Sequence, residues 1–324
     1  MRTRRTFLLA LSSTALIPGG VLAQRNAMVR IGWLSADKPN SPFFEAFRTG
    51  MKELGYVEGR NLVIEARFAE GSTEALDRFA VELVGLKPRV LVAQGGPGTH
   101  AVQKAGATMP VVFGYSGDPV AARLVASLAR PGGNFTGITF LSLDLVGKRM
   151  GLLRETLPSL KRVAIIANPG HAGEPDELRA SQGAAKSLGL DVDYHQTRTE
   201  SELDDALAAI LRARDGAIDV FPDAFTLRHG EKIAAFAVKN RVPAISGWAR
   251  FAEVGNLMAY GPNLQDVYRR LALHVDKIVK GARPADLPVE KATKVEMSVN
   301  IKVAQALGLT IPDAIVRQAV AVIK

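Results

Sequence analysis

The stretch Met109–Val120, MPVVFGYSGDPV, joins a buried-strand pattern to a polar turn. Its apolar run Pro110–Tyr115 predicts a buried strand, which the polar residues 116–119 end. Asp118 is a preferred helix N-cap and Pro119 fits a first helical turn, so we expect a helix to follow. Ligands of parallel α/β sheets bind beyond the carboxyl ends of the strands. This turn is therefore expected to form one wall of a ligand site.

The same alternation of strand and helix extends in both directions from this stretch. Strands are expected at residues 29–35, 61–67, 89–94, 110–115, 135–140, 162–167, 190–195, 217–221, 243–246, 255–260 and 295–299. Helices are expected at residues 42–54, 73–86, 100–107, 120–128, 143–157, 174–188, 200–214, 225–240, 264–280 and 300–307, with a last helix after residue 312. The order predicts an α/β protein with parallel sheets.

Two runs of βα units, joined near residue 140, predict two doubly wound, Rossmann-like lobes, and a length of 324 residues fits two domains. We expect residues 28–140 with part of 281–324 to form lobe one, and residues 141–280 to form lobe two. The chain is expected to cross the hinge near residues 140, 262 and 290, with its tail returning to lobe one. Lobes joined by a multi-segment hinge can close on a ligand.

Composition excludes several classes of function. The formal charge is +9 at pH 7, but it is spread thinly and aromatic residues make up only 6%, which argues against nucleic-acid binding. The chain has no cysteine, which excludes disulfides, Cys-ligated zinc and thiol nucleophiles. The five histidines show no metal-ligand spacing, and we expect His100 to face solvent in the first turn of a helix. Neither a metal nor a cofactor is therefore expected.

The N-terminus predicts export. A basic start is followed by the apolar segment Phe7–Ile17, too short to span a bilayer, then by a break and a small-residue cleavage site ending at Ala23. We expect residues 1–23 to be a secretory signal peptide. Thr3–Leu8 also resembles a twin-arginine export motif, and an ordinary Sec signal is the alternative. No later apolar run reaches membrane-spanning length and there is no cysteine to lipidate, so the mature chain is expected to be free in the periplasm.

Candidate ligand contacts follow the strand ends. Those of lobe one are Ser35, Gln94, Gly95, Gly96, Tyr115, Ser116 and Asp118, and those of lobe two are Asn168, Asp223, Ser246, Gly247 and Trp248, with Tyr260 at the closing edge. An amino acid needs donors for its carboxylate and an acceptor for its ammonium group. Glycine-rich turns supply N–H donors, Asp223 offers a carboxylate, and Trp248 and Tyr115 offer flat apolar faces.

Some of these residues have an equally good structural explanation. Asp118 is favoured as a helix cap over a ligand contact, and Asp223 fits both roles equally. Ser116 is favoured as a contact because a polar residue directly after a buried strand has few other roles. Trp33 and Phe43 are expected to pack in the core.

Enzyme motifs are missing or incomplete. Gly114–Asp118, GYSGD, is one residue short of the G-x-S-x-G nucleophile elbow, and the chain has no G-x-G-x-x-G, P-loop or H-E-x-x-H motif. An α/β enzyme acting on a small metabolite stays an alternative. A periplasmic ligand sensor for a receptor kinase is another, with the same ligand chemistry but no transport.

Several stretches carry a resemblance to a known family: Glu53–Gly59 (ELGYVEG), Val111–Val120, Leu128–Gly133 (LARPGG), Tyr260–Asn263 (YGPN), Asp286–Val289 (DLPV) and Ala306–Pro312 (ALGLTIP). In this order they resemble the ABC-transporter substrate-binding proteins typified by the tryptophan- and tyrosine-binding lipoproteins of bacteria. The resemblance runs from about residue 29 to the end, although the lipobox of many members is missing.

The resemblance implies a type I periplasmic-binding-protein fold. It also implies the function of a periplasmic solute-binding component of an ABC importer, which binds a small molecule between two lobes and releases it unaltered. Family ligands include aromatic amino acids, so an amino acid or a related small carboxylate is expected. The implied partner is an ABC permease in the inner membrane, and the protein is expected to be a monomer.

Overall fold

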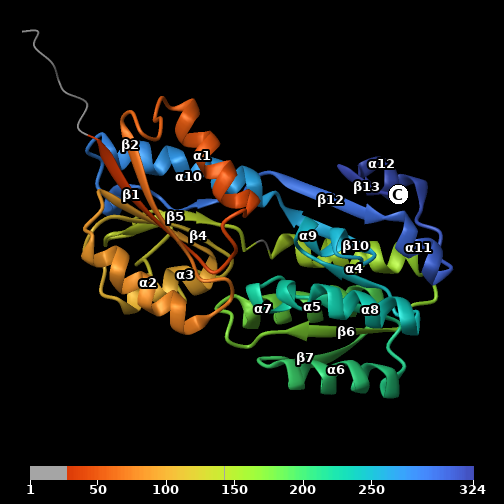
Figure 1. Ribbon diagram of the computed structural model, residues 1–324. Coiled ribbons are helices and arrows are strands. Elements are labelled where there is room, and N and C mark those ends of the chain that lie inside the picture. The colour runs from red at the N-terminus through yellow and green to blue at the C-terminus, as the bar shows by residue number, and fades with distance from the viewer. Residues whose placement is uncertain (1–27, 142) are drawn as a thin grey trace, which may run out of the picture.

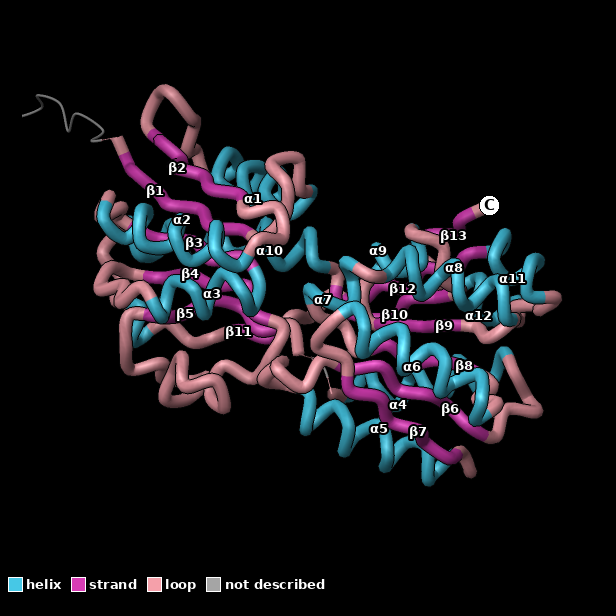
Figure 2. The backbone as a smooth tube through the Cα atoms, turned by 60° about the horizontal axis from the view of Figure 1, so that its bottom comes forward, coloured by secondary structure: helices cyan, strands magenta, loops and turns pink. Residues whose placement is uncertain are grey.

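Two β-sheets organise the chain in this computed structural model, which describes residues 28–141 and 143–324 (Figure 1). The expected signal peptide, residues 1–23, lies outside the described residues. Figure 2 shows the two sheets in separate lobes, with loops meeting between them. The α/β fold class with two mostly parallel sheets is confirmed.

Sheet one has the strand order β11-β5-β4-β3-β1-β2, and all its strand pairs are parallel. Its strands are β1 (Val29–Ser35), β2 (Leu62–Phe68), β3 (Val90–Gln94), β4 (Val111–Tyr115), β5 (Phe135–Thr139) and β11 (Glu290–Lys291). Its helices are α1 (Pro42–Glu53), α2 (Thr73–Gly85), α3 (Gly95–Lys104) and α10 (Leu264–Val279), with the short 3₁₀ helix η1 (Pro284–Asp286). Because helices cover both faces, strands such as β3 and β4 are buried throughout and mostly apolar.

Sheet two has the order β13-β12-β10-β9-β8-β6-β7, and only the β10–β12 pair is antiparallel among its described pairs. Its strands are β6 (Arg162–Ala167), β7 (Asp191–Gln196), β8 (Ala217–Val220), β9 (Ala244–Ser246), β10 (Met258–Pro262), β12 (Val295–Asn300) and β13 (Ala321–Ile323). Its helices are α4 (Asp144–Thr156), α5 (Glu174–Leu188), α6 (Glu200–Ala213), α7 (Ala224–Arg228), α8 (Gly230–Asn240), α9 (Ala249–Glu253), α11 (Ile301–Leu307) and α12 (Asp313–Gln318).

The chain passes between the sheets at three places: from β5 to α4, from β10 to α10 and from β11 to β12. Residues 264–280, expected in lobe two, instead belong to lobe one. The apolar stripe of α10, including Leu271 and Val275, packs against α1 and sheet one (Figure 1). Part of residues 281–324 was expected on lobe one, and β11 does pair there with β5. The tail after β11 does not stay on lobe one but joins lobe two, because β12 pairs with β10 and β13 pairs with β12.

Several local expectations also differ from the structure. Residues 120–128 form turns rather than a helix: Asp118 Oδ1 accepts hydrogen bonds from the backbone N–H groups of Val120 and Ala121, but Arg123 adopts φ +55°, which ends the helical path. The helix expected at 225–240 is divided at His229 into α7 and α8. Helix α3 starts at Gly95 rather than at residue 100, and α9 and β13 were not expected.

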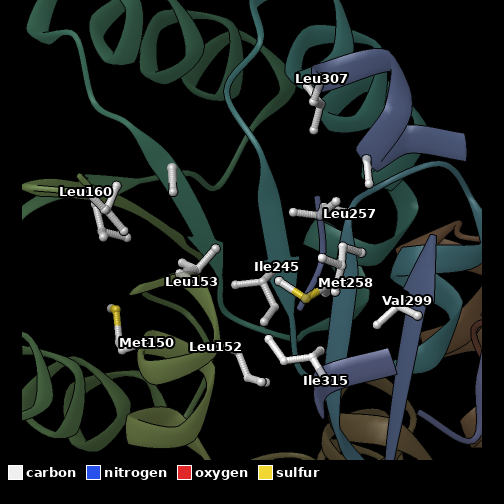
Figure 3. Close-up of a cluster of buried hydrophobic side chains, with 14 of the residues drawn as sticks. Met150, Leu152, Leu153, Leu160, Ile245, Leu257, Met258, Val299, Leu307 and Ile315 are labelled. Atoms are coloured by element: carbon white, nitrogen blue, oxygen red, sulfur yellow. The ribbon is translucent and has the colours of Figure 1, made fainter. Parts of the chain in front are cut away.

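Each lobe is held by clusters of buried apolar side chains. Trp33 is fully buried against Phe44 and Phe47, and Phe43 packs at the edge of the same cluster, as expected. In lobe two, α4 residues such as Met150 and Leu153 lie near Ile245 of β9 and Met258 of β10 (Figure 3). Burying one such side chain contributes about 1.5–3 kcal/mol. These cores fix the strand ends that face the other lobe.

Candidate functional site

The lobes touch through loops at the carboxyl ends of their strands. Ser116 Oγ, after β4, lies 2.9 Å from His171 Nε2, after β6, within hydrogen-bond distance. A Cβ atom added at Gly117 would lie 3.2 Å from the Ala172 Cβ. One added at Gly71, after β2, would lie 3.2 Å from the Arg228 guanidinium carbon. The lobes are therefore in a closed arrangement.

A small cavity of about 10 Å³ lies at this contact. Lobe one and the first crossing line it with Ser116, Phe140 and Leu141, and lobe two and the second crossing line it with Arg149, Glu177, Pro222, Gly247, Trp248 and Pro262. This volume is enough for about one water molecule. A ligand as large as an amino acid therefore requires the lobes to separate.

Two of the cavity residues, Arg149 and Glu177, form a buried charged cluster with Asp219 in lobe two. Arg149, on α4, donates from Nη2 to Glu177 Oε1 of α5 at 2.9 Å and from Nε to Asp219 Oδ1 of β8 at 3.1 Å. Their side chains are at most 4% exposed. Glu177 Oε2 and Asp219 Oδ2 are buried without a hydrogen-bond partner among the described residues. Two carboxylates thus face one guanidinium, and each keeps a free acceptor oxygen.

Burial sets the protonation of this group. It raises the pKa of Glu177 to about 7, against the opposing attraction of Arg149. It also raises the pKa of Asp219, which Arg149 opposes in the same way. The pKa of Arg149 is raised by its two acidic partners, although burial alone would lower it. The cluster therefore carries a permanent guanidinium and a carboxyl group that titrates near neutral pH.

Gly247 makes room for this cluster. A Cβ atom added there would lie 2.7 Å from Pro222 Cγ and 3.3 Å from Arg149 Nη1. Any larger residue would push against the proline or the guanidinium. The loop after β9 therefore approaches Arg149 closely because residue 247 lacks a side chain.

A second polar group lies at the ends of β1 and β3 in lobe one. Gln94 Nε2 donates to Asp37 Oδ2, and Ser41 Oγ donates to the same oxygen at 3.0 Å. Ser35 Oγ accepts a hydrogen bond from the backbone N–H of Asp37 at 2.9 Å. Two expected contact residues, Ser35 and Gln94, thus take part in this loop network. Neither of them is among the residues that line the cavity.

Other expected residues of lobe one have structural roles. The Tyr115 hydroxyl lies 2.9 Å from His100 Nε2, and Tyr115 is buried. His100 thus has a side-chain partner, although it is exposed as expected. Gly95 and Gly96 begin α3. Asp118 was expected to cap a helix, but it accepts hydrogen bonds from Val120 and Ala121 in a turn that does not continue as a helix.

The expected residues of lobe two likewise include some that line the cavity and some that have structural roles. Gly247 and Trp248 line the cavity, as Ser116 does from lobe one. Asp223 caps α7, because its Oδ1 accepts from the Thr226 N–H at 2.7 Å, while its Oδ2 accepts from Asn168 Nδ2 at 2.7 Å. Both oxygens of Asp223 are therefore engaged within the lobe.

The two remaining candidates do not line the cavity. Ser246 is a buried residue at the end of β9. Tyr260 packs against the apolar cluster of lobe two.

Sequence reasoning missed the charged cluster. Asp219 carried a signal, since it interrupts the otherwise apolar strand Ala217–Val220. Arg149 and Glu177 lie inside amphipathic helices, where a charged residue is normally expected to face solvent. Only the packing of α4 and α5 on sheet two shows that these two side chains point inward.

Comparison with known proteins decides the family. The sequence model of the family described as ABC transporter substrate binding protein matches residues 42–323. The chain belongs to this family. This substrate-binding protein is 24% identical over 279 residues to the tyrosine-binding protein of Clostridioides difficile (strain R20291), a match that covers 85% of this chain and 78% of that protein.

Solved structures agree with this substrate-binding fold. A conserved domain protein from Vibrio cholerae superposes with a TM-score of 0.82 at 27% identity, over 91% of this chain and 99% of that one. A Streptococcus pneumoniae ABC domain in complex with L-Trp gives a TM-score of 0.84 at 23% identity, over 92% and 100%. The type I periplasmic-binding-protein fold is confirmed, and the relatives are solute-binding proteins rather than enzymes. No helix among residues 28–141 and 143–324 has both the length and the apolar character needed to cross a membrane.

Proposed function

We propose that this substrate-binding protein binds a free amino acid between its lobes, with aromatic amino acids as the leading candidates, and delivers it to an ABC permease. The relatives support this class of ligand, since one is named a tyrosine-binding protein and another was solved with L-Trp. The N-terminal pattern supports export, so the proposed place of action is the periplasm. We expect a monomer that docks on the permease.

The charged group at the interlobe cavity carries this proposal. Arg149 supplies N–H donors for a ligand carboxylate, and Ser116 supplies a hydroxyl from the opposite lobe. The unpartnered Oε2 of Glu177 is an acceptor for a ligand ammonium group. A zwitterion would thus place opposite charges against groups that are already buried and fixed in position. Such preorganisation favours affinity because little side-chain entropy is lost on binding.

The apolar wall of the cavity suits a hydrophobic ligand side chain. The rings of Trp248 and Phe140 lie 5.9 Å apart at 65°, an edge-to-face arrangement across the two lobes. Leu141 extends this wall on the lobe-one side. An aromatic ligand side chain would take a place beside these groups when the lobes move apart.

The hinge connects binding to lobe movement. Phe140 and Leu141 stand at the first crossing of the chain between lobes, and Pro262 stands at the second. A rotation about these crossings changes the cavity walls directly, so the volume for a ligand depends on the angle between the lobes. Ligand entry and release then require the same opening movement.

A thermal-shift screen of the mature chain tests the proposal. The protein is first unfolded and refolded to remove any bound metabolite, then heated with each of the L-amino acids and with benzoate. We expect L-Tyr or L-Trp to raise Tm progressively with concentration, with about 2.7 kcal/mol of stabilisation at 100 times Kd.

Ligand analogues provide the matched controls. Tyramine and tryptamine lack the carboxylate, and the corresponding arylpropionates lack the ammonium group. Loss of either group is expected to weaken binding at least tenfold if both ends are recognised. If no amino acid shifts Tm, or if a product accumulates from any of them, the proposal is wrong.

A further inference from the structure

Another polar cluster, separate from the interlobe cavity, lies on the face of sheet two that α6 covers. Asp193 and His195 alternate along β7 with Val192 and Tyr194, which pack on the opposite face. Asp215 follows α6 and leads into β8. One metal-ligating atom from each of the two aspartates and His195 lies within 4.8 Å of the others. None of the three lines the interlobe cavity.

Two atoms of this cluster are buried without a hydrogen bond. His195 Nε2 and Asp215 Oδ2 have no hydrogen-bond partner among the described residues. The Asp215 side chain is 0% exposed, and burial raises its pKa, helped by the charge of Asp193. A buried carboxylate oxygen without a hydrogen bond is costly, and a cation placed between Asp215 Oδ2 and the His195 imidazole would remove that cost. His195 Nε2 itself lies 3.4 Å from Asp193 Oδ2.

Arg162 is the positive group nearest to this cluster. Its Nε lies 3.2 Å from Asp215 Oδ1 and its Nη2 lies 3.6 Å from Asp193 Oδ2. Its side chain is 44% exposed, so the guanidinium can swing out into solvent. The two carboxylates and the one guanidinium together leave a net charge of −1. The cluster therefore attracts further positive charge.

We propose that Asp193, His195 and Asp215 bind a divalent transition-metal ion of the zinc class, and that Arg162 neutralises the two carboxylates when the ion is absent. One imidazole nitrogen and two carboxylate oxygens are ligands that Zn²⁺ accepts. In a tetrahedral site such ligand atoms lie about 3.3 Å apart. His195 Nε2 and Asp193 Oδ2 already lie 3.4 Å apart, and all three ligand atoms lie within 4.8 Å of one another, so a movement of at most about 1.5 Å brings in Asp215.

The bound ion would stabilise one edge of lobe two. Strand β7 is the edge strand of sheet two, while Asp215 connects α6 to the inner strand β8. A metal bound to both segments would hold the edge strand to the interior of the sheet. Its binding energy would then add to the stability of the folded protein, because the site does not exist in the unfolded chain.

The test uses the untagged mature chain, treated with EDTA and then titrated with Zn²⁺ while Tm and heat of binding are recorded. Wild type is expected to bind one Zn²⁺ saturably and to melt at a higher temperature. His195→Gln and Asp215→Asn are each expected to weaken Zn²⁺ binding at least tenfold. Asp204→Asn is the matched control, since this exposed aspartate of α6 is paired with Lys232. It should keep the wild-type response.

Arg162→Gln separates a metal site from a simple ion-pair cluster. Without the guanidinium the carboxylates repel each other, so the variant should melt lower than wild type in EDTA. Zn²⁺ should restore its Tm and should bind it at least as tightly as wild type. The proposal is overturned if wild type shows no saturable Zn²⁺ binding, if His195→Gln binds like wild type, or if Zn²⁺ fails to rescue Arg162→Gln.

Discussion

Among single residues, Glu177 makes the stability of the protein depend on pH. Burial raises its folded-state pKa to about 7, above the value of an exposed glutamate. Between those two values the folded protein binds a proton that the unfolded chain has lost. Stability is therefore expected to fall by about 3 kcal/mol as pH rises through this range and to level off above pH 7.

Glu177→Gln should flatten that slope, since glutamine keeps the shape of the side chain but does not titrate. The measurement is the free energy of unfolding by urea at several pH values for wild type and variant. Parallel pH profiles for the two proteins would contradict the assignment of this slope to Glu177.

We expect replacement of Arg149 to destabilise the fold more than replacement of any other cavity residue. Arg149→Met leaves two buried carboxyl groups, Glu177 and Asp219, without their cation, so we expect a loss of about 3–5 kcal/mol in the free energy of unfolding. The conservative Arg149→Lys keeps the charge and should be more stable than Arg149→Met, although lysine cannot reproduce the hydrogen bonds to both carboxyl groups. Chemical denaturation gives the free energy of unfolding of both variants. Wild-type stability in Arg149→Met would show that the cluster does not depend on this guanidinium.

Variants of Asp223 distinguish a helix-capping role from a ligand-binding role. The sequence allowed it to hold a ligand ammonium group, but the structure engages both of its oxygens, with Thr226 and Asn168. Asp223→Ala should lose about 0.5–2 kcal/mol of stability, while Asp223→Ser keeps a cap and should stay close to wild type. Calorimetric titration should find ligand affinity nearly unchanged in Asp223→Ser. A stable Asp223→Ser protein that no longer binds amino acids would restore the ligand role.

Of the cavity residues, the sequence identified Ser116, Gly247 and Trp248 because each follows a strand end, where this fold places ligands. It did not identify Arg149 and Glu177, since a charge inside an amphipathic helix carries no sign of which way it points. That direction depends on how α4 and α5 pack on sheet two, which is a tertiary property.

At the scale of elements, the loop after β4 limits how far the lobes can close. Gly117 faces Ala172 and Gly173 of lobe two, and a Cβ atom there would also lie 2.9 Å from the Tyr115 ring. Gly117→Val should therefore hold the lobes apart and weaken ligand binding more than tenfold, with a smaller effect on stability. Gly133→Val is the control, because nothing lies within 4 Å of a Cβ at that exposed glycine. Equal affinity in both variants would contradict this role of the loop.

Helices and strands with a strong hydrophobic periodicity were predictable from the sequence, whereas segments whose structure depends on tertiary contacts were not. The amphipathic pattern of α10 predicted a helix, but not that its apolar face packs on α1 within lobe one. Asp118 and Pro119 predicted a helix start, yet the following residues turn away at Arg123. Local signals thus gave the type of most elements, while the partners of α10 and β12 depended on contacts distant in sequence.

At the scale of the whole molecule, we propose that the two lobes close on an amino acid by rotation about the three crossings of the chain. The closed arrangement leaves a cavity of only about 10 Å³, so a lobe-open state must also be populated for a ligand to enter. A ligand that bridges Arg149 and Ser116 would favour closure because it contacts both lobes only when they are together.

The most direct test measures the distance between the lobes during a ligand titration. The chain has no cysteine, so Glu74→Cys in α2 and Glu231→Cys in α8 give two unique positions for a fluorescent pair. Both residues are exposed, and they follow by three positions Gly71 and Arg228, which face each other across the lobes. Because the proposed ligand holds the lobes together, we expect a longer mean distance without ligand and a saturable one-to-one shift to the short distance as L-Tyr or L-Trp is added. A distance that no amino acid changes would contradict it.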